Sequence, residues 1–130
     1  MAHLTDEQAR LLLEPNFGVL ATVRPDGSPQ ATAVWVDFDG QHPLVNTIAG
    51  RSKERYLRRD PRATLVVFDR ENPYRSLSLS GEVELVEEGA GEHLDRLAEK
   101  YLGPEGYERP PDEKRVIGRM TVSRVNVYGF

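Results

Sequence analysis

Short runs in which apolar and polar residues alternate cover much of the chain, and a period of two is typical of β-strands with one buried face. The runs 17–24 and 30–38 flank the segment 25–29, whose Asp-Gly pair favours a β-hairpin. Further strands are expected at 44–48, 63–68, 74–87 and 116–128. Run 63–68 is apolar throughout, and we therefore expect it to be buried on both faces.

Three helices are expected between these strands. Thr5 and Gln8 form a capping box at the start of the first helix. The second helix is predicted to begin at Ser52, a favourable N-cap residue, and to end before Pro61, which cannot continue it. The segment 92–102 has its apolar residues at helical spacing and predicts the third helix.

Two further features indicate that the strands close into a barrel. Gly81 interrupts the long run 74–87 and predicts a bulge or bend, which barrels need at their corners. In run 30–38 both alternating sets of side chains are partly apolar, as expected of a barrel wall that is covered on its outside. The sequence thus predicts a mainly β (α+β) fold, a small antiparallel Greek-key β-barrel with short peripheral helices, as one domain over 1–130.

Composition describes an ordinary globular chain, with 38% hydrophobic and 29% charged residues. No apolar run approaches the length of a membrane helix, and the N-terminal residues lack the pattern of a signal peptide. The 130 residues include no cysteine, which excludes disulfides and thiolate metal sites from this sequence. A net charge of −4 disfavours nucleic acid as the main partner. We expect a cytoplasmic protein that binds neither membranes nor nucleic acids.

One strongly basic stretch, 46–62, contrasts with this overall acidity, because it holds six of the 17 basic residues. Its strand end turns at Ala49-Gly50 into the second predicted helix. Arg51, Ser52 and Lys53 would then lie at a helix N-terminus, where unpaired N–H groups and the helix dipole favour an anion. The alternative is a solvated basic face. We interpret the stretch as a phosphate-binding strand, turn and helix.

Residues for acid–base or metal chemistry are not grouped in the sequence. The three histidines, His3, His42 and His93, are expected at the surface, and no zinc-binding spacing or nucleotide-binding glycine pattern is present. Trp35 and the pair Tyr74-Arg75 are candidates for an aromatic wall and an additional cation beside an anionic ring system. Their alternative roles are core packing for Trp35 and loop solvation for Arg75. No metal site and no catalytic residue is assigned.

Several of these motifs together resemble one known family. They are Phe17–Thr22, Pro25–Gln30, Ala33–Trp35, Arg51–Lys53, Leu57–Arg62, Ser80–Val83 and Val127–Gly129. This set is similar to the pyridoxamine-5'-phosphate-oxidase-like superfamily of FMN-binding split β-barrels, and within it to the branch that uses the deazaflavin coenzyme F420. The resemblance covers nearly the whole chain.

The resemblance implies a homodimer with the cofactor in a groove between two barrels. It implies phosphate contacts from Arg51 and Lys53, helped by Ser52 and Thr47. The strand from Gln30 to Trp35 would line the ring pocket, and Tyr74 and Arg75 would lie close to it.

The expected function is hydride transfer from F420 to a small conjugated or heteroaromatic substrate, in which the cofactor performs the redox step. Three alternatives remain open at this point. They are an FMN-dependent reductase or oxidase on the same fold, a non-catalytic flavin- or deazaflavin-binding protein, and a nucleic-acid binder, which the net acidity disfavours.

Overall fold

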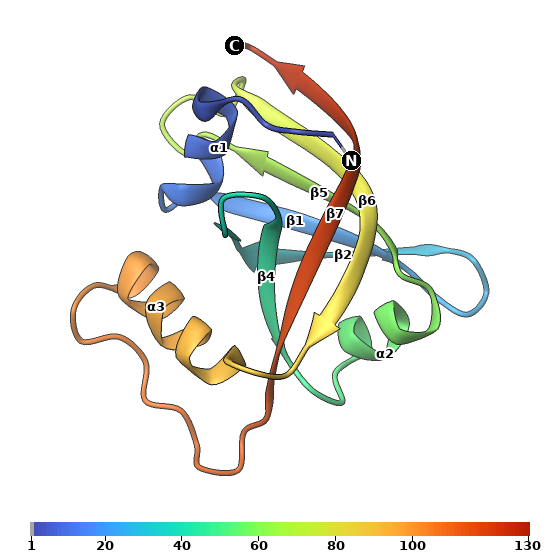
Figure 1. Ribbon diagram of the computed structural model, residues 1–130, viewed down its shortest axis with the longest axis vertical. Helices are drawn as coiled ribbons and strands as arrows, with labels where there is room; N and C mark the ends of the chain where they lie inside the picture. Colours follow the sequence, from blue (N-terminus) through green and yellow to red (C-terminus); the bar gives the residue numbers. More distant parts are fainter. Residues whose placement is uncertain (1) are drawn as a thin grey trace.

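One antiparallel sheet of seven strands dominates the computed structural model, which describes residues 2–130 (Figure 1). The strands are β1 (Phe17–Val23), β2 (Pro29–Trp35), β3 (Asp37–Phe38), β4 (Pro43–Ile48), β5 (Arg62–Phe68), β6 (Ser76–Val86) and β7 (Arg115–Tyr128). The helices are α1 (Asp6–Leu13), α2 (Ser52–Arg59) and α3 (Ala90–Leu102). The strand order is β2-β1-β5-β6-β7-β4-β3.

The sheet has to curl because its two edges are joined by a single residue. β2 lies at one edge and β3 at the other, and only Val36 separates them in the sequence. Within the sheet β5, β6 and β7 are neighbours in that order, and β4 lies on the far side of β7. The connection from β4 to β5, which contains α2, therefore spans this group of strands, and this is the Greek-key order. The predicted antiparallel split barrel with short peripheral helices is confirmed.

The run 30–38, predicted as one strand, is broken at Val36, where the chain leaves one edge of the sheet and enters the other. The break takes the backbone groups of Val36 out of the strand ladders, and buried backbone groups need other partners. α3 supplies them: the Val36 N–H donates to Tyr101 Oη at 3.0 Å, and the Val36 carbonyl accepts from Lys100 Nζ at 2.6 Å. These bonds hold α3 against Val36, where the two edges of the sheet are joined; we call this junction the seam of the barrel.

The core fills the inside of the curled sheet, and α1 and α2 close it at two ends. Leu11 and Leu12 of α1 and Leu57 of α2 are buried against the inward side chains of the strands. The core residues of the strands are Leu20, Val34, Val45, Ala63, Leu65, Val67, Leu77, Leu79, Val83, Met120 and Val122, and Val36 between β2 and β3 joins them.

The prediction that 63–68 is buried on both faces is wrong for this chain. In β5 the burial alternates, and the outward Val66 is 36% exposed. An apolar run of this kind normally needs a covering layer on each side, and none of the elements in residues 2–130 covers this part of the outer face of β5. The predicted strand 74–87 is also too long, because Tyr74 and Arg75 belong to a turn closed by the Arg75 N–H and the Asn72 carbonyl.

Two local predictions from the sequence are confirmed. The Thr5 side chain accepts from the Gln8 N–H while Gln8 bonds back to Thr5, which completes the capping box of α1. The register between β6 and β7 shifts between Ser80 and Gly81, where the bulge was expected. In residues 2–130 no helix combines the length and the apolar composition that crossing a membrane would require.

Candidate functional site

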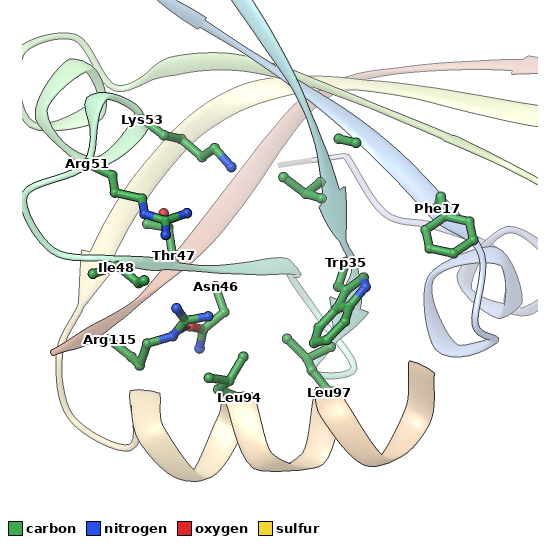
Figure 2. Close-up of a pocket in the computed structure, with 12 residues that line it drawn as sticks. Phe17, Trp35, Asn46, Thr47, Ile48, Arg51, Lys53, Leu94, Leu97 and Arg115 are labelled. Atoms are coloured by element: carbon green, nitrogen blue, oxygen red, sulfur yellow. Dashed lines mark hydrogen bonds between the residues drawn. The ribbon is translucent and has the colours of Figure 1, made fainter. Parts of the chain in front are cut away.

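A pocket of about 320 Å³ lies between the barrel and α3 (Figure 2). Residues from β1, β2, β4, the start of α2, α3 and the start of β7 form its walls. The lining residues are Phe17, Ala33, Val34, Trp35, Asn46, Thr47, Ile48, Arg51, Lys53, Leu94, Leu97 and Arg115. Its volume is near the lower end of the range for small-molecule sites, about 300–1,000 Å³.

The cationic end of the pocket is built where β4 turns into α2. Arg51 and Lys53 reach into it from this corner, and Arg115 comes from the start of β7, paired in register with Ile48 of β4 (Figure 2). The predicted N-cap is wrong by one residue: Arg51 holds the N-cap position without a side-chain cap, and Ser52 is the first helical residue. The N–H groups of the first turn therefore lack a side-chain cap, and such groups are suited to an anion.

Positive charge at this end has little compensation from the protein. Neither Arg51 nor Lys53 forms an ion pair with any residue in 2–130. Burial lowers the pKa of the Lys53 ammonium, and the nearby charges of Arg51 and Arg115 lower it further. Burial also lowers the pKa of Arg115, against the opposing effect of Glu113. An anion in the pocket would relieve this repulsion.

The opposite end of the pocket is aromatic and apolar. The Trp35 indole stacks on the Tyr101 ring, with centroids 5.1 Å apart and planes 5° from parallel. The Tyr101 hydroxyl bonds to the backbone of Val36 and Asn16, so the ring that supports Trp35 is held in place. Leu97 of α3 lies beside Trp35 at this end, and Leu94 lies closer to Asn46 and Arg115 (Figure 2). A ligand with an anionic end and a flat apolar end would match both halves.

The structure brings four of the eight candidate residues named from the sequence into this pocket and leaves four outside it. Trp35, Thr47, Arg51 and Lys53 line it. Ser52 lies on α2, where its hydroxyl accepts from Arg55. Gln30 lies at the start of β2 and accepts from the Thr22 hydroxyl.

Tyr74 and Arg75 are at a different surface. Tyr74 is 87% exposed in the turn before β6. Arg75 pairs with Glu7 at 2.9 Å and with Asp69 at 3.5 Å, and its guanidinium lies over the Phe130 ring. Within one copy of the chain these two residues do not meet the pocket that contains Arg51 and Lys53.

Asn46 and Arg115 are pocket residues that the sequence did not single out. Arg115 lies 64 positions after Arg51 in the sequence and is brought close only because β7 pairs with β4. A basic residue at the start of a strand does not by itself indicate, in the sequence, that it will lie beside another basic site. The role of Asn46 is likewise visible only from its hydrogen-bond partners Ala90, His93 and Arg115.

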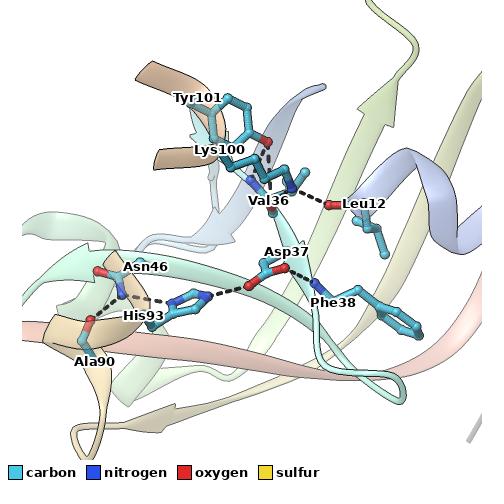
Figure 3. A network of polar contacts seen from close by, with 9 residues as sticks. All are labelled: Leu12, Val36, Asp37, Phe38, Asn46, Ala90, His93, Lys100 and Tyr101. Carbon is cyan, nitrogen blue, oxygen red and sulfur yellow. Dashed lines mark hydrogen bonds and ion pairs between the residues drawn. The ribbon is translucent and has the colours of Figure 1, made fainter. Parts of the chain in front are cut away.

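His93 was predicted at the surface, and this prediction is wrong. Its side chain is 0% exposed on the inner face of α3, bonded to Asp37 and Asn46 (Figure 3). Burial opposes the charge of Asp37, but the hydrogen bonds from His93 and from the Phe38 N–H outweigh it, and the pKa of Asp37 is lowered. Across residues 2–130 no three His, Asp or Glu side chains come together as metal ligands.

Comparison with known proteins gives matches over nearly the whole chain. The sequence profile of the family described as pyridoxamine 5'-phosphate oxidase matches residues 4–129. A pyridoxine/pyridoxamine 5'-phosphate oxidase of Nostoc sp. is 37% identical over 98 residues, which are 73% of this chain and 45% of that protein. The chain thus spans about half the length of this relative.

Two relatives of similar size carry the coenzyme F420 in their names. An F420H(2)-dependent biliverdin reductase of Mycobacterium tuberculosis is 27% identical over 124 residues, which are 94% of this chain and 86% of that one. A solved structure named F420 reductase is 34% identical, with a TM-score of 0.82 over 95% of this chain and 98% of that one.

Proposed function

The chain belongs to the pyridoxamine 5'-phosphate oxidase family of oxidoreductases, and from this premise we propose that it uses the deazaflavin coenzyme F420 to reduce a small conjugated or heteroaromatic substrate. The observation that carries the proposal is the two-ended pocket, with Arg51 and Lys53 at one end, neither in an ion pair within residues 2–130, and Trp35 at the other. The preference for F420 over FMN rests on the likeness to the F420-dependent relatives.

The residues of the pocket fit a cofactor that has a phosphate and a planar ring. Arg51 and Lys53, together with the first N–H groups of α2, would hold the phosphate, and Thr47 adds a hydroxyl beside them. Trp35, supported from behind by Tyr101, offers a flat apolar surface to the ring. When bound in its reduced form, F420 supplies the hydride. The chain's own contribution is to bind and orient, which is worth a large share of the barrier in such reactions.

The cofactor is tested by titrating F420 and FMN separately into the purified protein and following the fluorescence of Trp35, the single tryptophan. We expect F420 to bind at least ten times more tightly than FMN, about 1.4 kcal/mol. The reverse order would move the assignment to an FMN-dependent reductase or oxidase, which the pyridoxamine 5'-phosphate oxidase relative represents. Binding of neither below millimolar concentration would overturn the proposal.

We also propose that the protein is a homodimer whose two barrels share the cofactor groove. The pocket of one chain is small for a whole cofactor, and apolar side chains remain exposed on the outer surface of the sheet, among them Phe17 and Val66. A second copy is the simplest cover for such a surface, because closed two-fold assemblies are the commonest oligomers.

Light scattering at micromolar concentration measures the assembly. The expected mass is twice the 14.7 kDa of one chain. A monomer that binds F420 with full affinity would contradict the shared groove and leave the cofactor assignment standing.

A further inference from the structure

The imidazole of His93 is fully buried and contacts two separate segments: Asn46, which lines the pocket, and Asp37, which follows the seam residue Val36. Its Nε2 lies 2.9 Å from Asp37 Oδ2, and its Nδ1 lies 3.0 Å from Asn46 Nδ2 (Figure 3). A buried polar atom needs a partner, and both ring nitrogens have one. His93 is the single polar member of the buried face of α3, where the other buried residues are Ala90, Leu94, Leu97 and Ala98.

The partners of Asn46 determine which way its amide points. The Ala90 carbonyl can only accept, and it lies 2.9 Å from Asn46 Nδ2. The Arg115 Nε–H can only donate, and it lies 3.0 Å from Asn46 Oδ1. The NH2 group of Asn46 therefore faces His93, and the oxygen faces Arg115.

This orientation assigns the tautomer of His93. Because Asn46 donates to Nδ1, that nitrogen is the acceptor, and the ring proton is on Nε2, directed at the Asp37 carboxylate. A proton on Nδ1 would set two donors against each other. Relief by an amide flip would then turn the Asn46 NH2 toward the Arg115 Nε–H and break that contact as well.

Charged groups lie at both ends of this chain of contacts: Asp37 at one end, and at the other Arg115, whose pKa burial lowers, Glu113 and Tyr107 raise, and Arg51 and Arg109 lower. Asp37 comes from β3, and Lys100 of α3 acts on it through its charge. On the other side Arg115 comes from β7, and its Nη1 lies 3.2 Å from Glu113 in an ion pair. The Arg115 Nη2 makes no hydrogen bond to any residue in 2–130 while Arg115 lines the pocket.

We propose that His93 is a positioning residue that holds Arg115 toward an anionic group of the bound ligand. In its Nε2–H form, anchored by Asp37, it locks the Asn46 amide so that the amide oxygen receives the Arg115 Nε–H. The guanidinium is then held at Nε and paired at Nη1, and its remaining N–H groups are left for the ligand. The ligand part of this inference rests on the proposed function; the positioning part does not.

The positioning part is tested without any ligand by ¹⁵N NMR of the free protein. We expect the His93 shifts of an Nε2–H tautomer and an Arg115 Nε–H signal protected from exchange with water. In His93→Leu, which replaces the ring by an apolar side chain of similar bulk, the protection of that signal should be lost. In His93→Gln, whose amide can accept from Asn46 and donate to Asp37, it should be kept. An Nδ1–H tautomer, or equal protection in His93→Leu, would overturn the inference.

The ligand part is tested by a double-mutant cycle with F420 as the probe, after thermal denaturation has shown that each variant is folded. We expect His93→Leu to weaken F420 binding about tenfold and His93→Gln less than threefold. In the Arg115→Met background, His93→Leu should cost nothing further, because its effect passes through Arg115. Additive losses would reveal a merely structural role and overturn it. If the wild-type protein does not bind F420, the proposed function fails, while the NMR result still decides the positioning.

Discussion

Gly81→Ala is expected to lower the free energy of unfolding by about 3 kcal/mol, a large share of the total for a domain of this size. A Cβ at this position would lie 2.0 Å from the Thr121 carbonyl oxygen and 3.1 Å from the Val122 Cα. The three nearest atoms are all backbone atoms of β7, and no side-chain movement relieves a clash with them. The two longest strands of the sheet would have to separate at their bulge.

Thermal and denaturant unfolding measure this loss, and a fall in Tm of about 10 °C is expected. Gly91→Ala is a matched control. There the three atoms nearest to the new methyl group belong to the guanidinium of Arg109, the closest at 2.5 Å. That group is the far end of a flexible side chain paired with Asp95 at the surface, so it can move aside, and a change within about 0.5 kcal/mol is expected. Equal losses in both variants would contradict the close backbone contact at the bulge.

Arg51→Ala and Lys53→Ala are each expected to weaken F420 binding by about 1.5–3 kcal/mol, the range for a hydrogen bond to a charged group. Both side chains line the pocket without an ion pair in residues 2–130. The structure also predicts that Lys53→Ala leaves the free protein no less stable, because the wild-type ammonium is partly buried beside two other cations. Titration and thermal denaturation of the same samples separate the two effects.

Arg59→Ala is the matched control on the same helix. Its guanidinium bonds to the Pro25 carbonyl at the surface and lies outside the pocket. Arg58 is less suitable, since it pairs with the buried Glu54 and its removal would leave that carboxylate without its partner. An equal loss of affinity in Arg59→Ala would point to diffuse electrostatic attraction rather than a defined phosphate site.

The lowered pKa of Lys53 adds a dependence on pH to the same prediction. As the pH rises through that pKa, the ammonium loses its charge before an unperturbed lysine would, and anion affinity should fall. Inorganic phosphate stays dianionic at alkaline pH. A fall in phosphate affinity above about pH 8 is therefore caused by a titrating group of the protein and not by the phosphate. Lys53→Arg keeps its charge and should flatten the curve. An unchanged slope in Lys53→Arg would assign the fall to another group.

Local features of the fold could be predicted from the sequence because their causes lie within a few residues. The capping box at Thr5 and the bulge at Gly81 both follow from local backbone chemistry. Alternation placed most strands to within a few residues. Alternation missed the break at Val36, because the run 30–38 continues from one edge strand of the sheet into the other. It also assigned Tyr74 and Arg75 to a strand, although they belong to a turn.

The candidate site divides in the same way. The basic corner at Arg51 and Lys53 is contiguous in the sequence, and a helix N-terminus after a turn is a local pattern. Arg115 and Asn46 join it through the pairing of β7 with β4, and His93 is buried because α3 packs its inner face toward the barrel seam. A single sequence contains no record of which distant strands pair.

The sequence by itself determined the period of the strands, the capping box of the first helix, the bulge glycine and a basic corner suited to an anion, because each depends on neighbours along the chain. Only the tertiary structure decided that the sheet curls around Val36, that Trp35 faces the pocket on the support of Tyr101, and that His93 and Asn46 direct Arg115. These arrangements depend on contacts between segments from 47 to 69 residues apart, such as Asn46 with His93 and Asn46 with Arg115. Packing and hydrogen bonding in three dimensions determine contacts of that range, and local propensity does not encode them.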